Sequence, residues 1–377
     1  MILETKNHIC CFGKKTEVVV FDGEHVLRTT FDELDRMILY GKPNKFKIPS
    51  SDGKWVDCEL LKSPQCTLHR IQLWNAMRLL ISENHIHATS EGYKETKDLN
   101  AGDFLRMNTR VIEGIRNTGG ATYDLGYIVG LYLSDFSFIS DSDNRPCVSY
   151  HFRRFLASRD NRLIDCMRVV DPECSWEKLP IDEGGYYIRC YSKKISDYIK
   201  YWTNWTGKKR SVEKQLNPDC LVESSEFRCG IKDGYFDAEY ALCNSSARLS
   251  SKQAAECLQT LCMSLGIVTK VSKKYTGKTY KKIHRGHIRT IKDTEYKVIM
   301  RERIFGTSKN ITGNLEHLYP IVNGERYIKI RHLKRYELDC YHADLYGFAT
   351  EDNSDIYFCL PFGMVTHNGG INNAEIL

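Results

Sequence analysis

The segment Phe362-Gly-Met-Val-Thr-His-Asn-Gly369 carries a chemically fragile peptide bond near the C-terminal end of the sequence. Asn followed by Gly is the dipeptide most prone to attack by its own side chain. The Asn amide can close a five-membered ring, and Gly leaves the approach open. His367, directly before Asn368, is a potential proton donor near neutral pH. An Asn-Gly pair alone more often marks a surface turn, so its interpretation depends on the rest of the chain.

A second reactive segment, Cys10-Cys-Phe-Gly-Lys-Lys-Thr-Glu-Val18, lies more than three hundred residues earlier. Cysteine supplies a sulfur nucleophile, and the β-branched, apolar run that follows is typical of a strand. A cysteine near one end and a His-Asn pair near the other are the groups needed to break a chain at both ends. We therefore expect the fold to bring the two segments together. A buried structural thiol is the alternative for the cysteine.

The composition is that of a globular protein with two or three domains. The 377 residues exceed one typical domain, and 27% charged with 42% hydrophobic residues is ordinary. The sequence has no run of 18 apolar residues, so it predicts no membrane span. The first ten residues lack the basic and then apolar order of a signal peptide. Fifteen cysteines without regular spacing or a CxxC pair exclude a zinc ribbon and indicate a reducing compartment. We expect a cytoplasmic location, in the host cell if the protein is viral.

The net charge of +6 is mild, but the cations are concentrated. Lys270–Arg289 holds eight Lys or Arg residues and no acid. In VTKVSKKYTGKTYKKI, apolar and basic residues partly alternate, which predicts a strand that presents one face to a phosphate backbone. A solvated β-hairpin is the alternative. The density of cations favours a polyanion as partner.

Two glycine-containing segments repeat about one hundred residues apart. Gly126 and Gly130 are four apart in YDLGYIVGLYLSD, and Gly230 and Gly234 are four apart in FRCGIKDGYFDAE. Residues four apart lie on one helix face. Glycine costs about 1 kcal/mol of helix stability relative to Ala, so the close approach of another backbone best explains two of them on one face. The pattern predicts two helices packed through their glycines.

An acid follows the second glycine by five residues in both segments, Asp135 after Gly130 and Glu239 after Gly234. Paired helices would place these acids side by side, where two negative charges repel unless a cation lies between them. Ordinary terminal acids of two core helices are the alternative for either copy alone. The matching offset favours a Mg²⁺ site formed by Asp135 and Glu239. Together with the basic segment it predicts Mg²⁺-dependent cleavage of phosphodiester bonds.

The remaining sequence predicts a β-rich region that is interrupted and then resumes. Residues 17–106 are predicted to form short strands and turns, with 69–82 as one long strand or helix, and residues 1–10 are too short for a structural unit. Residues 250–266 predict a helix with a serine N-cap and a leucine stripe, ended by Gly266. From about Tyr319 the pattern returns to strands. The helices and the basic segment are therefore an insertion.

These segments resemble those of an intein of the Hint fold that carries a LAGLIDADG homing endonuclease. The resemblance covers nearly the whole chain and is most specific in DLYGFATEDNSDIYFCLPFGMVTHN, which fits the two C-terminal intein blocks. CFGKKTEVV fits the N-terminal block, with Cys11 first and Thr16 and Val18 at the usual places, and Ser82-Glu-Asn-His85 fits the TxxH block. YIVGLYLSD and DGYFDAE fit the two LAGLIDADG motifs, and SKQAAECLQTLCMSLGI fits the block after them. Lys214-Gln-Leu-Asn-Pro218 resembles the segment that bears a lysine before the second motif.

The resemblance implies a mostly β Hint splicing domain built from both chain ends, with an inserted α+β endonuclease domain of pseudo-two-fold symmetry. The implied division is a host-protein remnant (N-extein) at 1–10, the splicing domain at 11–120 and 296–368, the endonuclease at 121–295 and a C-extein remnant at 369–377. The implied partners are double-stranded DNA carrying a homing site and the covalently linked exteins. We expect a monomer without membrane association.

The resemblance also assigns catalytic roles. The implied residues are Cys11, Ser82, Asn84, His85, His367 and Asn368 for splicing, and Asp135, Glu239 and Lys214 for DNA cleavage with Mg²⁺. In the family, the Cys11 sulfur attacks the preceding carbonyl to form a thioester, and His85 protonates the leaving amide nitrogen. Ser82 and Asn84 hold the scissile peptide, and Asn368 cyclises with help from His367. His87 would face the same side of a strand as His85, so it is an alternative to that residue.

The sequence departs from the family at several positions. Gly369 stands where the family has Cys, Ser or Thr, so the chain lacks the acceptor for joining its flanks, and we expect cleavage without ligation. Phe136 and Tyr240 replace the last glycine of the two endonuclease motifs, although the acids remain. Gly347 aligns where the family often has Asp or Cys, with Asp344 nearby.

Three alternatives remain open. The first is a DNA endonuclease on an inactive splicing scaffold, and the second is a decayed element with neither activity. The third, a hedgehog-type processing domain, is disfavoured by the terminal His-Asn pair and the inserted segment.

Overall fold

The structure, a computed structural model, describes most of the chain. The described residues are 3–4, 12–63, 67–75, 77–116, 118, 120–133, 137–140, 146–152, 157–180, 185–205, 214–238, 246–284, 287–300, 317–336, 345–350, 357–361 and 363–367. Within these ranges, no helix is both long and apolar enough to cross a membrane.

The chain divides into two compact units. Unit 1 consists of Met1–Glu113, Met263–Thr269 and Arg301–Leu377, and unit 2 consists of Gly114–Cys262 and Lys270–Met300. The breaks after Glu113 and Met300 differ from the expected boundaries at 120/121 and 295/296. Residues 263–269 return to unit 1, which the sequence did not suggest.

Unit 1 is built on a large sheet to which both parts of the chain contribute. Its strand order is β10-β9-β11-β20-β7-β8-β2-β21-β6-β5-β3-β4, with β1 beside β6 and β19 beside β20. The early elements are β1 (Leu3–Glu4), β2 (Phe12–Gly13), β3 (Glu17–Phe21), β4 (Val26–Thr30), α1 (Phe31–Leu39), β5 (Phe46–Pro49), β6 (Trp55–Ser63), β7 (Leu68–Leu73), β8 (Arg78–Ser82), β9 (Ile86–Thr89), β10 (Gly92–Glu95), η1 (Thr96–Asp98) and β11 (Phe104–Met107). The late elements are β19 (Ile321–Val322), β20 (Glu325–Tyr336), β21 (Leu345–Thr350), β22 (Tyr357–Cys359) and β23 (Val365–His367).

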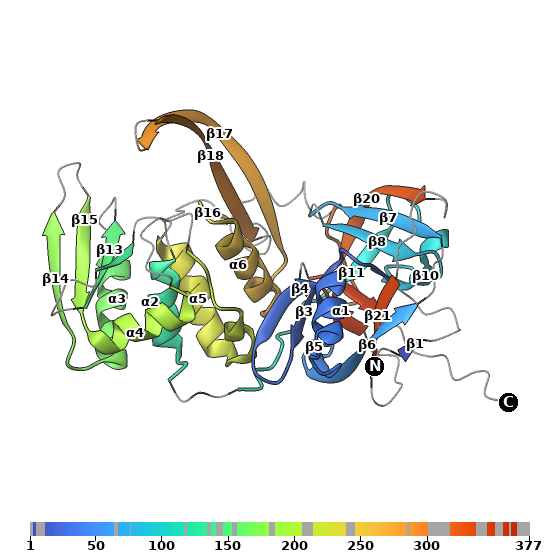
Figure 1. Cartoon of the computed structure of the whole chain (residues 1–377), viewed down its shortest axis with the longest axis horizontal. Helices are drawn as coiled ribbons and strands as arrows, with labels where there is room; N and C mark the ends of the chain where they lie inside the picture. Colours follow the sequence, from blue (N-terminus) through green and yellow to red (C-terminus); the bar gives the residue numbers. More distant parts are fainter. Residues whose placement is uncertain are drawn as a thin grey trace. The chain divides into compact units, whose positions relative to one another are not determined.

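The late strands lie between early ones. Strand β20 pairs with β11 on one side and β7 on the other, and β21 pairs with β2 and β6. The blue and red ribbons of unit 1 therefore alternate in Figure 1. The expectation that both chain ends build one β-rich unit is confirmed by this interleaving.

An aromatic core joins the two parts of the chain inside unit 1. The ring of Phe12 lies 5.8 Å from that of Phe31 and 6.0 Å from that of Phe358. Phe348 contacts both Phe31 (5.2 Å) and Phe358 (5.6 Å), and all four residues are buried. Such rings bury large apolar areas and gain about 0.5–1.5 kcal/mol per pair beyond their burial. The core therefore fixes Phe12 firmly in the sheet.

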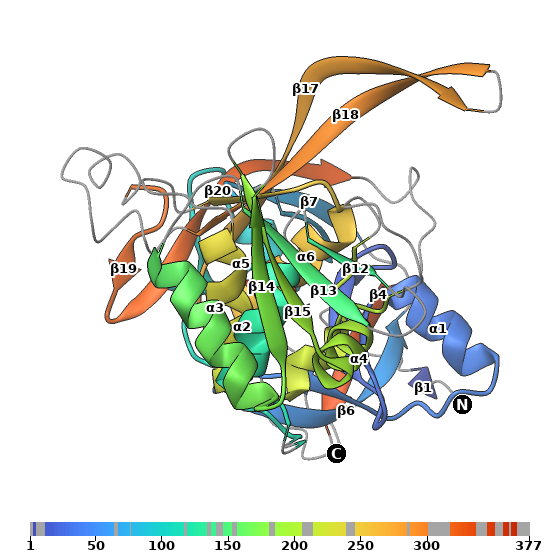
Figure 2. The same ribbon diagram turned by 90° about the vertical axis from the view of Figure 1, so that its left-hand side faces the viewer.

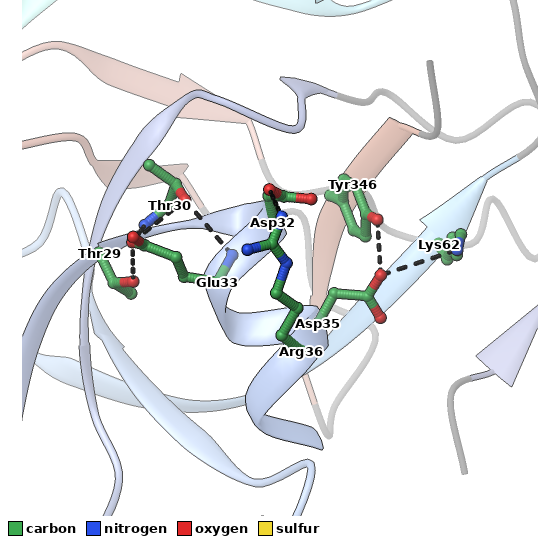
Figure 3. Close-up of polar contacts among 8 residues, drawn as sticks. All are labelled: Thr29, Thr30, Asp32, Glu33, Asp35, Arg36, Lys62 and Tyr346. Carbon is green, nitrogen blue, oxygen red and sulfur yellow. Dashed lines mark hydrogen bonds and ion pairs between the residues drawn. The ribbon is translucent and has the colours of Figure 1, made fainter. Parts of the chain in front are cut away.

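Helix α1 was not expected, because residues 17–106 read as strands and turns. A capping box begins it: the Thr30 hydroxyl accepts from the Glu33 amide (3.3 Å), and the Glu33 carboxylate accepts from the Thr30 amide (3.1 Å). Its buried positions Phe31, Leu34 and Ile38 follow the helical period. The signal was present in the sequence as Thr30-Phe-Asp-Glu33. Figure 3 shows this cap beside the inner face of the helix.

Residues 69–82 form a hairpin instead of one long strand or helix. Strands β7 and β8 pair from Leu68↔Ser82 to Gln72↔Arg78. The turn between them has the Leu73 amide donating to the Met77 carbonyl at 2.9 Å. Asn75 supports it by accepting from the Met77 amide at 3.1 Å. This Asx-type turn explains why the apolar run is broken in two.

Unit 2 combines helices with two antiparallel sheets. Its elements are α2 (Tyr123–Tyr132), β12 (Phe138–Ser140), β13 (Cys147–Phe152), α3 (Ala157–Val170), β14 (Ser175–Pro180), β15 (Tyr186–Tyr191), α4 (Lys193–Trp202), η3 (Pro218–Val222), α5 (Ser225–Ala238), β16 (Ser246–Leu249), α6 (Lys252–Ser264, ending in unit 1), β17 (Thr269–His284) and β18 (His287–Met300). The sheets have the orders β12-β13-β15-β14 and β16-β18-β17. Figure 2 shows α3 and α4 beside the first sheet, and the basic segment forms the long β17–β18 ribbon.

Helix α6 matches its expectation. The Ser251 hydroxyl accepts from the Ala254 amide at 3.2 Å, as an N-cap does. Leu258, Leu261 and Leu265 are buried, and Gly266 follows with a φ of +72°. A Cβ at Gly266 would lie 2.3 Å from the Thr109 carbonyl oxygen, so both the backbone angle and the space require glycine.

Candidate functional site

His85 lies in unit 1, where segments from the beginning and the end of the chain meet. It follows β8 and is completely buried. The ring of Phe12 lies 4.7 Å from the His85 ring in an edge contact. Phe12 itself is held on both sides, because β2 pairs with β8 at Ile81 and with β21 at Tyr346. The residue that follows Cys11 is therefore locked against the predicted proton donor.

The other side of His85 meets the last described strand. The His85 Nε2 atom lies 2.7 Å from Oγ1 of Thr366, a hydrogen bond between residues 281 apart in sequence. Thr366 is fully buried in β23, opposite Phe358 of β22. Sequence reasoning missed both Phe12 and Thr366. Their signal was only their position, one residue from Cys11 and two from Asn368.

Two of the predicted reacting residues, Cys11 and Asn368, lie outside the described residues. Each is bonded to a described neighbour, Phe12 and His367 respectively, and adjacent Cα atoms are about 3.8 Å apart. His367 is buried in β23 opposite Tyr357. Phe12, next to Cys11, and Thr366, two residues before Asn368, both contact His85.

The turn that carries His85 is fixed by backbone hydrogen bonds. The His85 amide donates to the Ser82 carbonyl (3.2 Å), and the His85 carbonyl accepts from the Thr96 amide (2.9 Å). Ser82 is buried at the end of β8, whereas Asn84 is partly exposed. The predicted Ser82-Glu-Asn-His85 segment is thus a turn that backbone hydrogen bonds hold at both Ser82 and His85.

His87 is close to His85 but differs in state. The two rings are 4.9 Å apart, with His87 in β9 and His85 just before that strand. The Thr96 hydroxyl donates its single proton to the His85 carbonyl (3.1 Å). His87 Nε2 lies 2.9 Å from the same hydroxyl oxygen, so this nitrogen carries a proton and donates it to Thr96. Complete burial lowers the pKa of His87 to about 3. His87 is neutral near pH 7 and supports the turn rather than supplying protons.

In unit 2, helices α2 and α5 approach through their four glycines. A Cβ built at Gly126 would lie 2.2 Å from the Phe227 carbonyl oxygen, and one at Gly230 would lie 2.2 Å from that of Tyr123. A Cβ at Gly130 would lie 2.1 Å from the Ile231 carbonyl oxygen, and one at Gly234 would lie 2.1 Å from that of Tyr127. The contacts are reciprocal, as expected for helices related by a two-fold axis. The predicted packing through glycines is confirmed.

A polar ladder that the sequence did not reveal joins the same helices. The Tyr123 hydroxyl donates to Asp233 (3.0 Å), and the Tyr127 hydroxyl donates to Asp237 (2.9 Å). Arg162 of α3 lies over the Tyr127 ring (4.6 Å) and 3.5 Å from Asp237. Burial and the neighbouring carboxylates raise the pKa of both tyrosines, so they stay protonated donors. The ladder adds directional contacts to the glycine packing.

The two predicted metal ligands, Asp135 and Glu239, lie outside the described residues. Helix α2 ends at Tyr132 with Leu133 as its cap, and α5 ends at Ala238, so each acid follows a helix end. Among the described parts of the chain, no group of three or more His, Cys, Asp or Glu could hold a metal ion. Carboxylate oxygens are ligands that Mg²⁺ accepts.

Lys214 lies at the end of α2. Its ammonium donates to the Tyr132 carbonyl (2.7 Å) and lies 4.7 Å from the Tyr132 ring centre. The residue is buried, and its own carbonyl accepts from the Ser251 hydroxyl at 2.6 Å. A cation there compensates the negative end of the helix dipole. The predicted lysine therefore contacts Tyr132, which is three residues before Asp135 in the sequence.

One face of the β12-β13-β15-β14 sheet carries polar and aromatic side chains. Tyr186, Ile188 and Cys190 of β15 are buried, whereas Tyr187 and Arg189 between them are partly exposed. The Tyr187 ring contacts those of His151 (5.1 Å) and Phe138 (5.8 Å). This alternation gives the sheet a half-exposed face with hydrogen-bonding groups.

Of the positions that depart from the intein pattern, only Gly347 is described. It is buried in β21 and pairs with Leu61 of β6. Asp344, Phe136, Tyr240 and Gly369 lie outside the described residues.

Comparisons with known proteins give only distant likenesses. No protein-family model and no curated protein matches the sequence. Among solved structures, the chain is similar to a variant of the homing endonuclease I-DmoI in complex with its target DNA in the presence of Mg, with 13% identity and a TM-score of 0.34 over 49% of this chain and 93% of that one. It is also similar to the VidaL intein (13% identity, TM-score 0.23, 26% and 71% covered). The transcription factor IIB Mvu mini-intein gives 14% identity and a TM-score of 0.23 over 27% of this chain and 70% of that chain. Likenesses at these identities and TM-scores do not establish a family for this chain.

Proposed function

We propose that unit 1 is a self-cleaving peptide-processing domain of the intein type. The observation that carries the proposal is the position of His85 between Phe12 and Thr366, since these residues come from opposite ends of the chain. A buried histidine bonded to one hydroxyl, beside the neighbours of a Cys and an Asn, is the arrangement that such a reaction needs.

Cleavage at the first junction follows from these groups. The Cys11 thiol attacks the carbonyl carbon of Cys10, a C–S bond forms and the C–N bond between the two residues breaks. The proton lost by the thiol is balanced by the proton that the Cys11 nitrogen gains from His85. The edge contact with Phe12 holds the imidazole beside the residue that follows Cys11. A thioester results, which an added thiol can cleave.

Cleavage at the second junction uses the Asn368 side chain. Its amide nitrogen attacks its own carbonyl carbon, the bond to Gly369 breaks, and a succinimide forms as the Gly369 nitrogen gains a proton. His367 assists this transfer from β23. Because Gly369 has no nucleophile, the acyl group cannot pass across, so the proposed products are cleaved fragments rather than a ligated host.

The test uses the full chain with longer flanks, incubated with a small thiol and analysed by mass. The chain should be cut before Cys11, Cys11→Ala should abolish that cut, and His85→Ala should slow it about a hundredfold, a typical general-acid contribution. His87→Gln is the matched control and should retain cleavage, because His87 is neutral. Cleavage before position 11 in the Cys11→Ala chain would contradict the mechanism. Gly369→Ser should yield a ligated product if acceptor loss is the only defect.

We propose a second function for unit 2, Mg²⁺-dependent cleavage of double-stranded DNA. The supporting observation is the reciprocal packing of α2 and α5 through their glycines. Asp135 follows Gly130 by five residues, and Glu239 follows Gly234 by five residues, so the two acids occupy equivalent positions in the two segments. A divalent ion held by two carboxylates would activate water and neutralise charge on a phosphate. The half-exposed sheet face and the basic β17–β18 ribbon support DNA as the partner.

The DNA activity is tested with the full chain on the DNA that surrounds its own coding insertion site, rejoined without the insert. Asp135→Asn and Glu239→Gln should each abolish cutting while DNA binding remains, and EDTA should have the same effect. Cys11→Ala, as control, should cut normally. Cutting by either acid variant at the wild-type rate would remove the metal-site proposal. DNA cutting without any thiol-dependent peptide cleavage would indicate an endonuclease on an inactive scaffold.

A further inference from the structure

A row of paired residues crosses the sheet of unit 1 and ends on the segment that precedes Cys11. Glu4 pairs with Lys62, Lys62 with Tyr346, and Tyr346 with Phe12, in consecutive ladders of β1, β6, β21 and β2. Residues 1–10 are too short for a structural unit of their own, but Leu3–Glu4 within them forms a strand. The chain before the proposed cleavage site is therefore held by the same sheet that holds the residue after it.

The place where β1 pairs is an edge that the other described strands leave open. Strand β5 pairs with β6 only from Trp55 to Cys58, and the β1 partners are Leu61 and Lys62, beyond that stretch. On its other side, β6 pairs with β21 as far as Ser63. An open strand edge offers backbone N–H and C=O groups to any extended peptide, and this is the basis of strand addition.

A buried polar cluster lies under this edge, as Figure 3 shows. The Tyr346 hydroxyl donates to Asp35 Oδ2 at 2.6 Å, and the Lys62 ammonium lies 3.7 Å from the same oxygen. The Lys62 ammonium is also 5.8 Å from the Tyr346 ring centre. Asp35 is only 7% exposed, and its Oδ1 has no hydrogen-bond partner among the described residues. The cluster thus fixes Lys62 and Tyr346, the two central members of the row.

We infer that the edge of β6 at Leu61–Lys62 is a docking site for the extended peptide that precedes Cys11, and that Lys62 gives it a preference for an acidic residue at position 4. The inference rests on the proposed self-cleavage, in which this peptide is the acyl half of the substrate. Backbone pairing accepts any extended sequence, whereas Lys62, the register partner of position 4, adds a positive charge that favours an acid there.

Docking at this edge helps the reaction by restraining the acyl side of the scissile bond. Glu4 and Phe12 are three strand spacings apart in the row, about 14 Å, although the eight residue steps between them could span about 27 Å when extended. Anchoring both ends therefore limits the positions open to the Cys10 carbonyl. The backbone ladders of β21 connect the two anchors, because Tyr346 is the register partner of both Lys62 and Phe12.

Docking is tested first by hydrogen exchange in the full-length Cys11→Ala chain, which stays intact. Peptides covering residues 1–10 and 58–63 should be protected, and Leu3→Pro should remove that protection because proline cannot continue a paired strand there. Unchanged exchange in Leu3→Pro would overturn the docking site. Loss of protection stands as evidence of docking whether or not the wild-type chain cleaves, so this arm separates the inference from the proposed function.

Charge selection is tested by thiol-induced cleavage before Cys11. Lys62→Glu should slow it about fivefold, Glu4→Lys should slow it similarly, and the double variant should recover most of the wild-type rate. Lys47→Ala is the matched control, since it removes the ion pair between Lys47 of β5 and Asp57 of β6 (2.6 Å) and should change nothing. Cleavage after Asn368 should stay the same throughout. A double variant no faster than the single ones would overturn the preference.

Discussion

The proposed sites of the two units are built in opposite ways. In unit 1, three different side chains meet once: an imidazole, an aromatic ring and a hydroxyl from three distant segments. In unit 2, one backbone contact is repeated, since each glycine of α2 has a counterpart in α5 at nearly the same distance. The first arrangement depends on chemical identity, and the second depends on the absence of side-chain volume.

This difference teaches how each site should respond to change. A site made of unlike groups loses one reaction step when one group is altered, while its fold remains. A site made by close backbone approach loses its geometry when any volume is added, whatever the chemistry of the added group. The following experiments use that distinction.

The largest effect is expected from adding a methyl group between the helices. Gly126→Ala places a Cβ 2.2 Å from a backbone oxygen, so α2 and α5 must separate, at a cost of about 3 kcal/mol or more in the stability of unit 2. Gly230→Ala should cost the same because its contact is the reciprocal one. Chemical denaturation and DNA cutting measure the loss.

Gly120→Ala is the control for that pair. Its added Cβ would lie 3.1 Å from the Tyr198 hydroxyl, whose side chain can move, and 3.6 Å from the Thr118 carbonyl oxygen, an ordinary contact distance. Peptide cleavage by unit 1 should survive all three changes. A clear inequality between Gly126→Ala and Gly230→Ala would break the two-fold relation.

The next effect is a pH-dependent loss of stability in unit 1 through His87. Its folded-state pKa of about 3 lies below the ordinary value of 6.5, so the unfolded chain binds a proton first as the pH falls. Stability is therefore lost progressively below pH 6.5, reaching about 2 kcal/mol by pH 5 from this group. His87→Gln should flatten that part of the stability profile, measured by urea unfolding at both pH values. Equal slopes in wild type and variant would show that His87 is accessible to protons.

A smaller effect is expected from the hydroxyl that holds His85. Thr366→Val keeps the shape but removes the 2.7 Å hydrogen bond, which should slow thiol-dependent cleavage about tenfold, or about 1.4 kcal/mol. Thr366→Ser keeps the hydroxyl and should remain near the wild-type rate. If valine and serine behave alike, Thr366 fills space and does not orient the imidazole.

The smallest effect concerns the cation at the end of α2. Lys214→Met removes the hydrogen bond to the Tyr132 carbonyl, but it also removes a buried charge, so the net loss should be only about 1 kcal/mol. Thermal unfolding of the Asp135→Asn background gives this value without interference from catalysis. A loss above about 3 kcal/mol would mark Lys214 as essential to folding rather than to the site.

The sequence was most informative where structure is local. Glycines four apart predict close helix packing, because the helical period is fixed by the backbone alone. Ser251 and Gly266 mark the ends of α6, because helix caps also depend only on nearby residues. The capping box of α1 was equally local and could have been found. The β7–β8 turn was hidden because its apolar residues continue on both sides of Asn75.

Contacts between distant segments could not be predicted in detail. That Cys11 and His367 should approach each other followed from their chemistry, but nothing in the sequence specified Thr366 as the partner of His85. The pairing of β20 and β21 between early strands is likewise a property of the assembled sheet. Register across a sheet depends on all its strands together, and no single stretch encodes it.

The interleaving of β20 and β21 also has a consequence in time. During synthesis, β2, β6, β7 and β11 emerge early, but each lacks one of its neighbours until β20 or β21 has been made, and Thr366 reaches His85 later still. The last residue of unit 2 is Met300, so this unit can fold while the rest of the chain is still being translated. Long-range β pairing is slow to form, so under the proposed mechanism the bond before Cys11 stays uncut during translation. The proposed release of the flanks would then follow completion of the polypeptide.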